Sequence, residues 1–235
     1  MKRWLLLVAS LSWVGCGFAF EPDHLTDLLE SRICLGCDLV QAPLQRANLE
    51  KINFKNAKLM NADLSWANLN HAVVQGSAFT GAFLDWADFS FAVVSASDFE
   101  SAGMNFVNLA YADMRGCHFK EADLSFSDLS DANLEGSDMT FVRLMGSHLM
   151  RANLSRVNLQ NAYLEGALLT QANLQNASLQ GASLLKADLT NANLQGANLK
   201  GAVITEALFK GANLGDATWV DGSHCLKEQI GPCKP

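Results

Sequence analysis

Large apolar side chains occupy every fifth position of the chain, without a break, from Leu39 to Trp219. A small residue, most often Ala, stands two positions before each of them, and neither position ever carries a charge. An α-helix would sweep a five-residue repeat around all its faces, and a strand of period two would alternate its sides. The pattern therefore predicts short extended segments joined by turns, with both apolar positions of each unit facing one axis.

The repeat carries a recognisable motif at 152–154, 172–174 and 192–194, where the residues are Ala-Asn-Leu. This motif resembles the pentapeptide-repeat family. The resemblance implies an all-β fold, a right-handed quadrilateral parallel β-helix with four units per coil, over residues 38–219 and about nine coils. The twenty-residue coil has independent support, because like residues recur at that spacing: Phe79, Phe99 and Phe119, and Asn133, Asn153, Asn173, Asn193 and Asn213.

The first nineteen residues read as a targeting segment. Lys2 and Arg3 precede an apolar run, and small residues follow up to Ala19, which is typical of a secretory signal peptide at 1–19 and too short for a membrane span. We expect export to the bacterial periplasm. The alternative is a lipid anchor at Cys16, which is disfavoured because Trp13 stands where a lipobox normally carries an aliphatic residue.

Both ends of a solenoid need covering, since open edges invite polymerisation. Residues 20–37 are predicted to form an N-terminal capping segment with a short helix: Asp23 is suited to the N-cap, and apolar residues follow at helical spacing. Those residues are Leu25, Leu28, Leu29 and Ile33. Residues 220–235 are predicted to form a C-terminal cap.

Five cysteines remain once the signal peptide is removed. In an exported protein close pairs favour disulfides, which pairs Cys34 with Cys37 and Cys225 with Cys233. Cys117 is left over at an inward position, where we expect a small buried hydrophobic side chain.

Charge and register disfavour several classes of function. Removing Lys2 and Arg3 changes the formal net charge from −7 to −9, so nucleic-acid binding by a basic face is not expected. The unbroken register leaves no loop insertion that could build a catalytic cleft, and we predict no catalytic residue, metal or cofactor. The best metal-like grouping is the column Asp98, His118 and Asp138, with the pair Asp128 and His148 weaker; we interpret both as solvated surface residues.

Aromatic residues occupy several of the turn positions. Gly and Asn are otherwise favoured there, because the turn requires a positive φ. Trp66, Trp86, Phe106 and Phe126 are spaced by twenty and should stack into an exposed ladder, with Phe91 and Tyr111 as a second pair on the next corner. The surrounding stretch 63–138 holds twelve acidic residues against Arg115 and Lys120. Exposed apolar patches usually mark an interface, here with a basic protein, a second copy or a sugar. The alternative is that these rings only cover neighbouring corners and stiffen the coil.

We therefore predict a non-enzymatic structural or protein-interaction module of the cell envelope that presents an acidic, aromatic face on a rigid solenoid. The alternative is an acidic DNA mimic that binds a type II topoisomerase, because the resemblance extends to quinolone-resistance pentapeptide proteins. The predicted signal peptide argues against that role, and fold alone does not transfer function. An envelope enzyme acting on carbohydrate would need a carboxylate pair in a cleft, and the repeat offers none.

Overall fold

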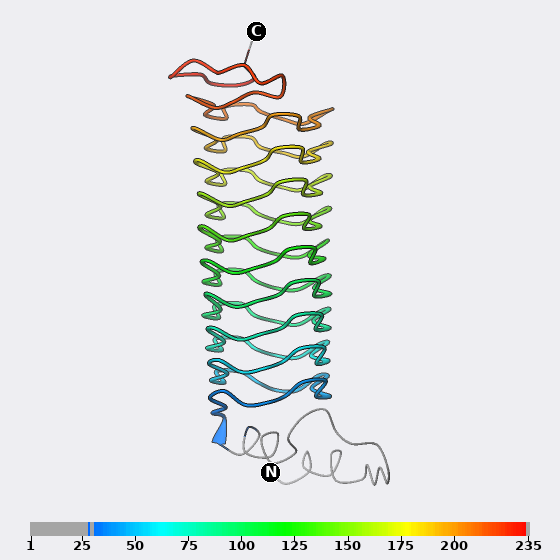
Figure 1. Ribbon diagram of the computed structural model, residues 1–235. Coiled ribbons are helices and arrows are strands. Elements are labelled where there is room, and N and C mark those ends of the chain that lie inside the picture. Colours follow the sequence, from blue (N-terminus) through cyan, green and yellow to red (C-terminus); the bar gives the residue numbers. More distant parts are fainter. Residues whose placement is uncertain (1–27, 29–30, 234–235) are drawn as a thin grey trace.

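The computed structural model describes residues 28 and 31–233, which wind into a straight stack of similar four-sided coils (Figure 1). Parallel β-bridges join residues twenty apart throughout the stack, from Ile33 with Asn53 to Asn198 with Thr218. Each five-residue unit contributes one bridging residue, so four parallel ladders of bridges run along the stack. The twenty-residue coil predicted from the sequence is confirmed.

Two kinds of backbone hydrogen bond build each coil. Between coils, the Leu39 amide donates to the Lys58 carbonyl and the Lys58 amide donates to the Cys37 carbonyl, both at 2.8 Å. Within a coil, the Ala42 amide donates to the Leu39 carbonyl at 3.0 Å and closes the corner turn. Because each unit satisfies its polar backbone groups with the same partners, the chain repeats one local geometry along the axis.

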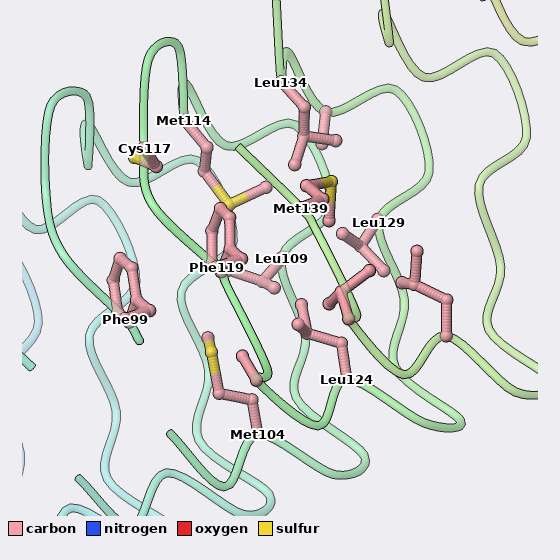
Figure 2. Close-up of a cluster of buried hydrophobic side chains, with 14 of the residues drawn as sticks. Phe99, Met104, Leu109, Met114, Cys117, Phe119, Leu124, Leu129, Leu134 and Met139 are labelled. Carbon is pink, nitrogen blue, oxygen red and sulfur yellow. The ribbon is translucent and has the colours of Figure 1, made fainter. Parts of the chain in front are cut away.

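The apolar positions fill the interior, as the five-residue register predicts. Figure 2 shows these side chains pointing into the coil, and Leu124 and Phe99 are fully buried. The Phe99 ring stacks on the rings of Phe79 and Phe119, with centroids 4.8 and 5.0 Å away. This spacing matches the separation of neighbouring strands, so the coil repeat itself sets the ring stack.

Polar side chains support the corners and the faces. The Oδ1 atom of Asn68 accepts from the Asn70 amide at 3.0 Å, and Asp88 holds the Ser90 amide in the same way at 2.9 Å. The predicted asparagine ladder is present, since the Nδ2 atom of each residue donates to Oδ1 of the one before it at 3.0–3.2 Å; its members are Asn133, Asn153, Asn173, Asn193 and Asn213. Asn and Asp therefore serve the same turn.

The N-terminal end is described only in part. Leu28 and Ser31 have helical backbone, and the Arg32 amide donates to the Leu28 carbonyl at 3.0 Å. The predicted signal peptide, Asp23, Leu25 and Leu29 lie outside the described residues, so the extent of the capping helix stays a prediction. Placing Ile33 on that helix was wrong: Ile33 is exposed and bridges Asn53, because its backbone already belongs to the first coil.

The C-terminal segment folds back over the last coil. Ile230 bridges Asn213 and His224 bridges Thr218, both antiparallel. Disulfides join Cys34 to Cys37 and Cys225 to Cys233, the two pairs expected from their spacing, with Cα atoms 5.4 and 5.5 Å apart. No helix within the described part of the chain has the length and apolar character needed to cross a membrane.

Candidate binding surface

Four aromatic rings form a continuous stack on one corner of the solenoid, which we call the aromatic ladder: Trp66, Trp86, Phe106 and Phe126. Successive ring centroids lie 4.9, 4.3 and 5.3 Å apart, and the planes are within 13° of parallel. Each side chain remains about half exposed, between 42% for Phe106 and 53% for Trp66. The predicted ladder is therefore present as an exposed apolar strip.

The backbone at these four positions is of a kind that bulky residues seldom adopt. The φ angles run from 58° at Phe106 to 64° at Trp66 and Trp86, in the left-handed region. Gly146 and Gly166 occupy the next two positions of the same column. A Cβ atom on Gly146 would lie 2.9 Å from two carbons of the Phe126 ring, so that ring rests on the glycine and the ladder ends there.

A second ring stack lies on the next corner and has one member more than the predicted pair. Phe91 stacks on Tyr111 at 5.0 Å, as expected, and His71 stacks on Phe91 at 5.1 Å. The twenty-residue spacing from His71 to Phe91 was the signal that could have revealed the third member. Above Tyr111 the column continues with Asp131, whose pKa is lowered by hydrogen bonds from Arg151 and, to a smaller extent, from Tyr111.

The metal-like column does not assemble a site. Asp98, His118 and Asp138 are bridged neighbours, yet the Asp98 carboxylate accepts from Thr80 and the Glu100 amide, and the Asp138 carboxylate accepts from Thr140. Among the residues that the structure describes, no three metal-ligating side chains lie together.

Cys117 is fully buried, in the place where Ser97 and Ser137 stand in the neighbouring coils. Its Sγ atom lies 3.2 Å from the Val94 carbonyl oxygen, and burial raises the thiol pKa to about 12. A thiol of this kind stays protonated and unreactive near neutral pH, as expected for a structural residue.

One shallow depression was not foreseen from the sequence. Glu121, Phe141, Arg143 and Tyr163 line it, and the Arg143 guanidinium carbon lies 5.9 Å from the centre of the Tyr163 ring. Phe141 is a corner aromatic with no aromatic neighbour twenty residues away in either direction. The depression is open and its side chains are exposed, so it is not an enclosed pocket.

The comparisons with known proteins agree on the fold. Pentapeptide repeats match residues 37–76, 67–105, 102–140, 147–184 and 182–218. HetL, a pentapeptide repeat protein involved in heterocyst differentiation regulation in the cyanobacterium Nostoc, is 30% identical over 88% of this chain and 100% of its own, with a TM-score of 0.45. A trypsin-treated form of QnrB1, a plasmid-mediated fluoroquinolone resistance protein, is 17% identical over 74% of this chain and 88% of its own, with a TM-score of 0.62.

No curated protein sequence matches the chain. The likeness to QnrB1 concerns the fold alone at this identity, whereas the repeat matches extend over nearly all of the coils. The chain therefore belongs to the pentapeptide-repeat family, whose members fold as the right-handed quadrilateral β-helix that the resemblance implied.

Proposed function

We propose that this protein is a non-enzymatic interaction module of the cell envelope and that the aromatic ladder is its principal binding surface. The observation that carries the proposal is the continuous, half-exposed ring stack of Trp66, Trp86, Phe106 and Phe126, because exposed apolar patches usually mark an interface. The left-handed φ does not itself distinguish the ladder, because Arg46 and Lys186 of the same column have φ of 58° and 59°.

Stacking does not by itself explain why four bulky rings occupy these turns. Each stacked pair contributes about 0.5–1.5 kcal/mol beyond its burial, whereas a left-handed backbone costs a non-glycine residue roughly 1–2 kcal/mol, so three pairs do not fully offset the cost at four positions. The rings are half exposed, and the coil closes equally well with glycine at the same corner. Most other corners have the same left-handed turn with a polar residue or glycine, so the fold does not require aromatic rings at this position.

Export is the second part of the proposal. It is supported by the signal-peptide pattern at 1–19 and by the two disulfides, since disulfides persist in oxidising compartments. Intact mass of the protein from the periplasmic fraction should give a chain beginning at Phe20. A chain retaining residues 1–19 would contradict cleavage, and a lipidated Cys16 would support the anchored alternative.

The topoisomerase alternative finds less support. QnrB1 is too distant in sequence for its role to be transferred, and an exported protein would not meet a cytoplasmic topoisomerase. An acidic surface alone does not choose between the two roles. The intact-mass measurement on the periplasmic fraction distinguishes the two roles, because a topoisomerase-binding protein would stay in the cytoplasm.

The binding role can be tested by photo-crosslinking inside the producing cell. A benzoyl-phenylalanine replaces either Phe106 in the ladder or Phe141 on another corner. The two positions are matched, since both have φ of 58° and are 42% and 41% exposed. We expect a discrete crosslinked adduct from position 106 and none from position 141.

A ladder variant completes the test. Trp66→Gly with Trp86→Gly should remove the position-106 adduct while leaving the far-UV circular dichroism spectrum unchanged, because glycine suits the turn. If positions 106 and 141 give the same adducts, or if the variant keeps the adduct, the ladder is not the binding surface. Loss of the native spectrum would instead show that the ladder is a structural element.

A further inference from the structure

The ring geometry limits what can bind to the ladder. Trp86 and Phe106 each have a ring stacked on both sides, at 4.3–5.3 Å, and Phe126 is covered by Phe106 and Gly146. Their exposed area must therefore come mainly from ring edges. Sugars and cations bind the faces of aromatic rings, and both faces are covered at Trp86, Phe106 and Phe126. The edges offer a flat apolar strip, about 15 Å long at the coil spacing.

The two sides of the solenoid that meet at the ladder carry a particular charge pattern. We define the ladder face as the outward residues of 63–71, 83–91, 103–111 and 123–131. No Lys or Arg occurs in these segments. Their carboxylates are Asp63, Asp85, Asp88, Asp123, Asp128 and Asp131.

Only one of these six carboxylates is neutralised within the described chain. Asp131 pairs with Arg151 at 2.5 Å, at the far margin of the face. The others make hydrogen bonds to polar neighbours but no ion pair within the described residues; for example, Asp88 accepts from Ser90 and Asp128 accepts from the Ser130 amide. Five negative charges thus flank the apolar strip without a cationic partner.

Away from the ladder face, Asp98 and Asp138 also make no ion pair within the described residues, whereas three other acidic residues of the same coils are paired. Asp113 binds Arg115 at 2.7 Å, Glu100 binds Lys120 at 3.3 Å and Glu135 binds Arg156 at 3.3 Å. The hydrogen bonds from Arg115 also hold the pKa of Asp113 below its usual value. These three cations lie away from the ladder face, and the nearest others stand one coil beyond its ends, Arg143 as the bridge partner of Asp123 and Arg46 before Trp66 in the same column.

We infer that the occupant of the ladder face is a cationic polypeptide segment, with apolar side chains along the ring edges and Lys or Arg beside the free carboxylates. This inference rests on the proposed binding role and names its chemistry. A second copy would bring five unpaired carboxylates against five more, and like charges opposed across an interface are unfavourable. A neutral sugar would leave those charges without partners, and three of the four rings would offer it only their edges.

The test uses the whole mature protein and a defined probe. The probe is a fluorescent twelve-residue peptide with Leu on one side and Arg on the other, and the comparison peptide has Ser in place of every Leu. Binding is followed by fluorescence anisotropy at low and high salt. We expect the Ser peptide to bind at least tenfold more weakly, and added salt to weaken both peptides.

The charge variants form a matched set. Asp88→Asn with Asp128→Asn removes two charges from the ladder face, and Asp98→Asn with Asp138→Asn removes two from another face of the same coils. All four carboxylates hold the amide two residues later, and Asn68 holds Asn70 identically, so asparagine preserves each turn. The first pair should weaken probe binding about fivefold at low salt, and the second by less than twofold.

Each contrary result has its own meaning. Equal effects of the two charge pairs would overturn the cationic partner, while the crosslink from position 106 would still decide whether the ladder binds at all. A dimer in sedimentation velocity that Trp66→Gly with Trp86→Gly abolishes would make a second copy the occupant. Binding of cellohexaose that the same variant abolishes would make the occupant a sugar. Either result would refute the inference.

Discussion

Phe99→Ala and Phe106→Ala remove the same side chain from two parallel ring stacks of this protein, one inside the solenoid and one outside. Phe99 is fully buried, and its ring stacks on Phe79 and Phe119 at 4.8 and 5.0 Å. Phe106 is 42% exposed and stacks on its two neighbours at 4.3 and 5.3 Å. Because both rings have two stacking partners, the loss of stacking largely cancels in the comparison.

The remaining difference is burial and cavity formation. A buried Phe→Ala change costs about 3–5 kcal/mol, because packed neighbours cannot close the space. The half-buried Phe106 should lose only about 1–2 kcal/mol of apolar burial, and solvent fills the gap. Guanidinium denaturation followed by circular dichroism should therefore place the unfolding free energy of the Phe99 variant about 1–4 kcal/mol below that of the Phe106 variant, with similar m values. Equal losses would refute the assignment of the two stacks to interior and surface.

Two further predictions concern the register and the buried thiol. Inserting one residue between Gly136 and Ser137 should abolish the cooperative thermal transition, because every later inward side chain turns outward. The same insertion between Lys227 and Glu228 in the cap should change the melting temperature little. An unchanged melting temperature for the first insertion would contradict the coil geometry. Burial raises the Cys117 pKa to about 12 in the folded protein. The unfolded thiol ionises above about pH 8.5. The free energy of unfolding should therefore fall by about 2 kcal/mol between pH 8 and pH 10.5, where only the unfolded thiol loses its proton. The variant Cys117→Ser, which matches Ser97 and Ser137 of its column, should not show this decrease in unfolding free energy when urea titrations are repeated from pH 8 to pH 10.5. If both proteins have the same pH profile, ionisation of Cys117 does not cause the decrease.

The amino-acid sequence by itself determined the solenoid, its register and its interior. Leu124 and Phe99 could be placed inward because each five-residue unit repeats the same short-range geometry, so one local rule holds for every coil. The two disulfides could be paired for a related reason, since each closes a short stretch of chain within one cap. The ladder at Trp66 to Phe126 followed from the same spacing.

Only the tertiary structure decided how the outward side chains meet. His71 joins the second stack, and Asp131 pairs with Arg151 of the next coil, while Asp88 and Asp128 make no ion pair within the described residues. Ile33 enters a bridge with the first coils instead of continuing a helix. Outward side chains choose among several rotamers and partners on neighbouring coils, so their contacts depend on which side chains lie above and below them, and the five-residue repeat does not specify those choices.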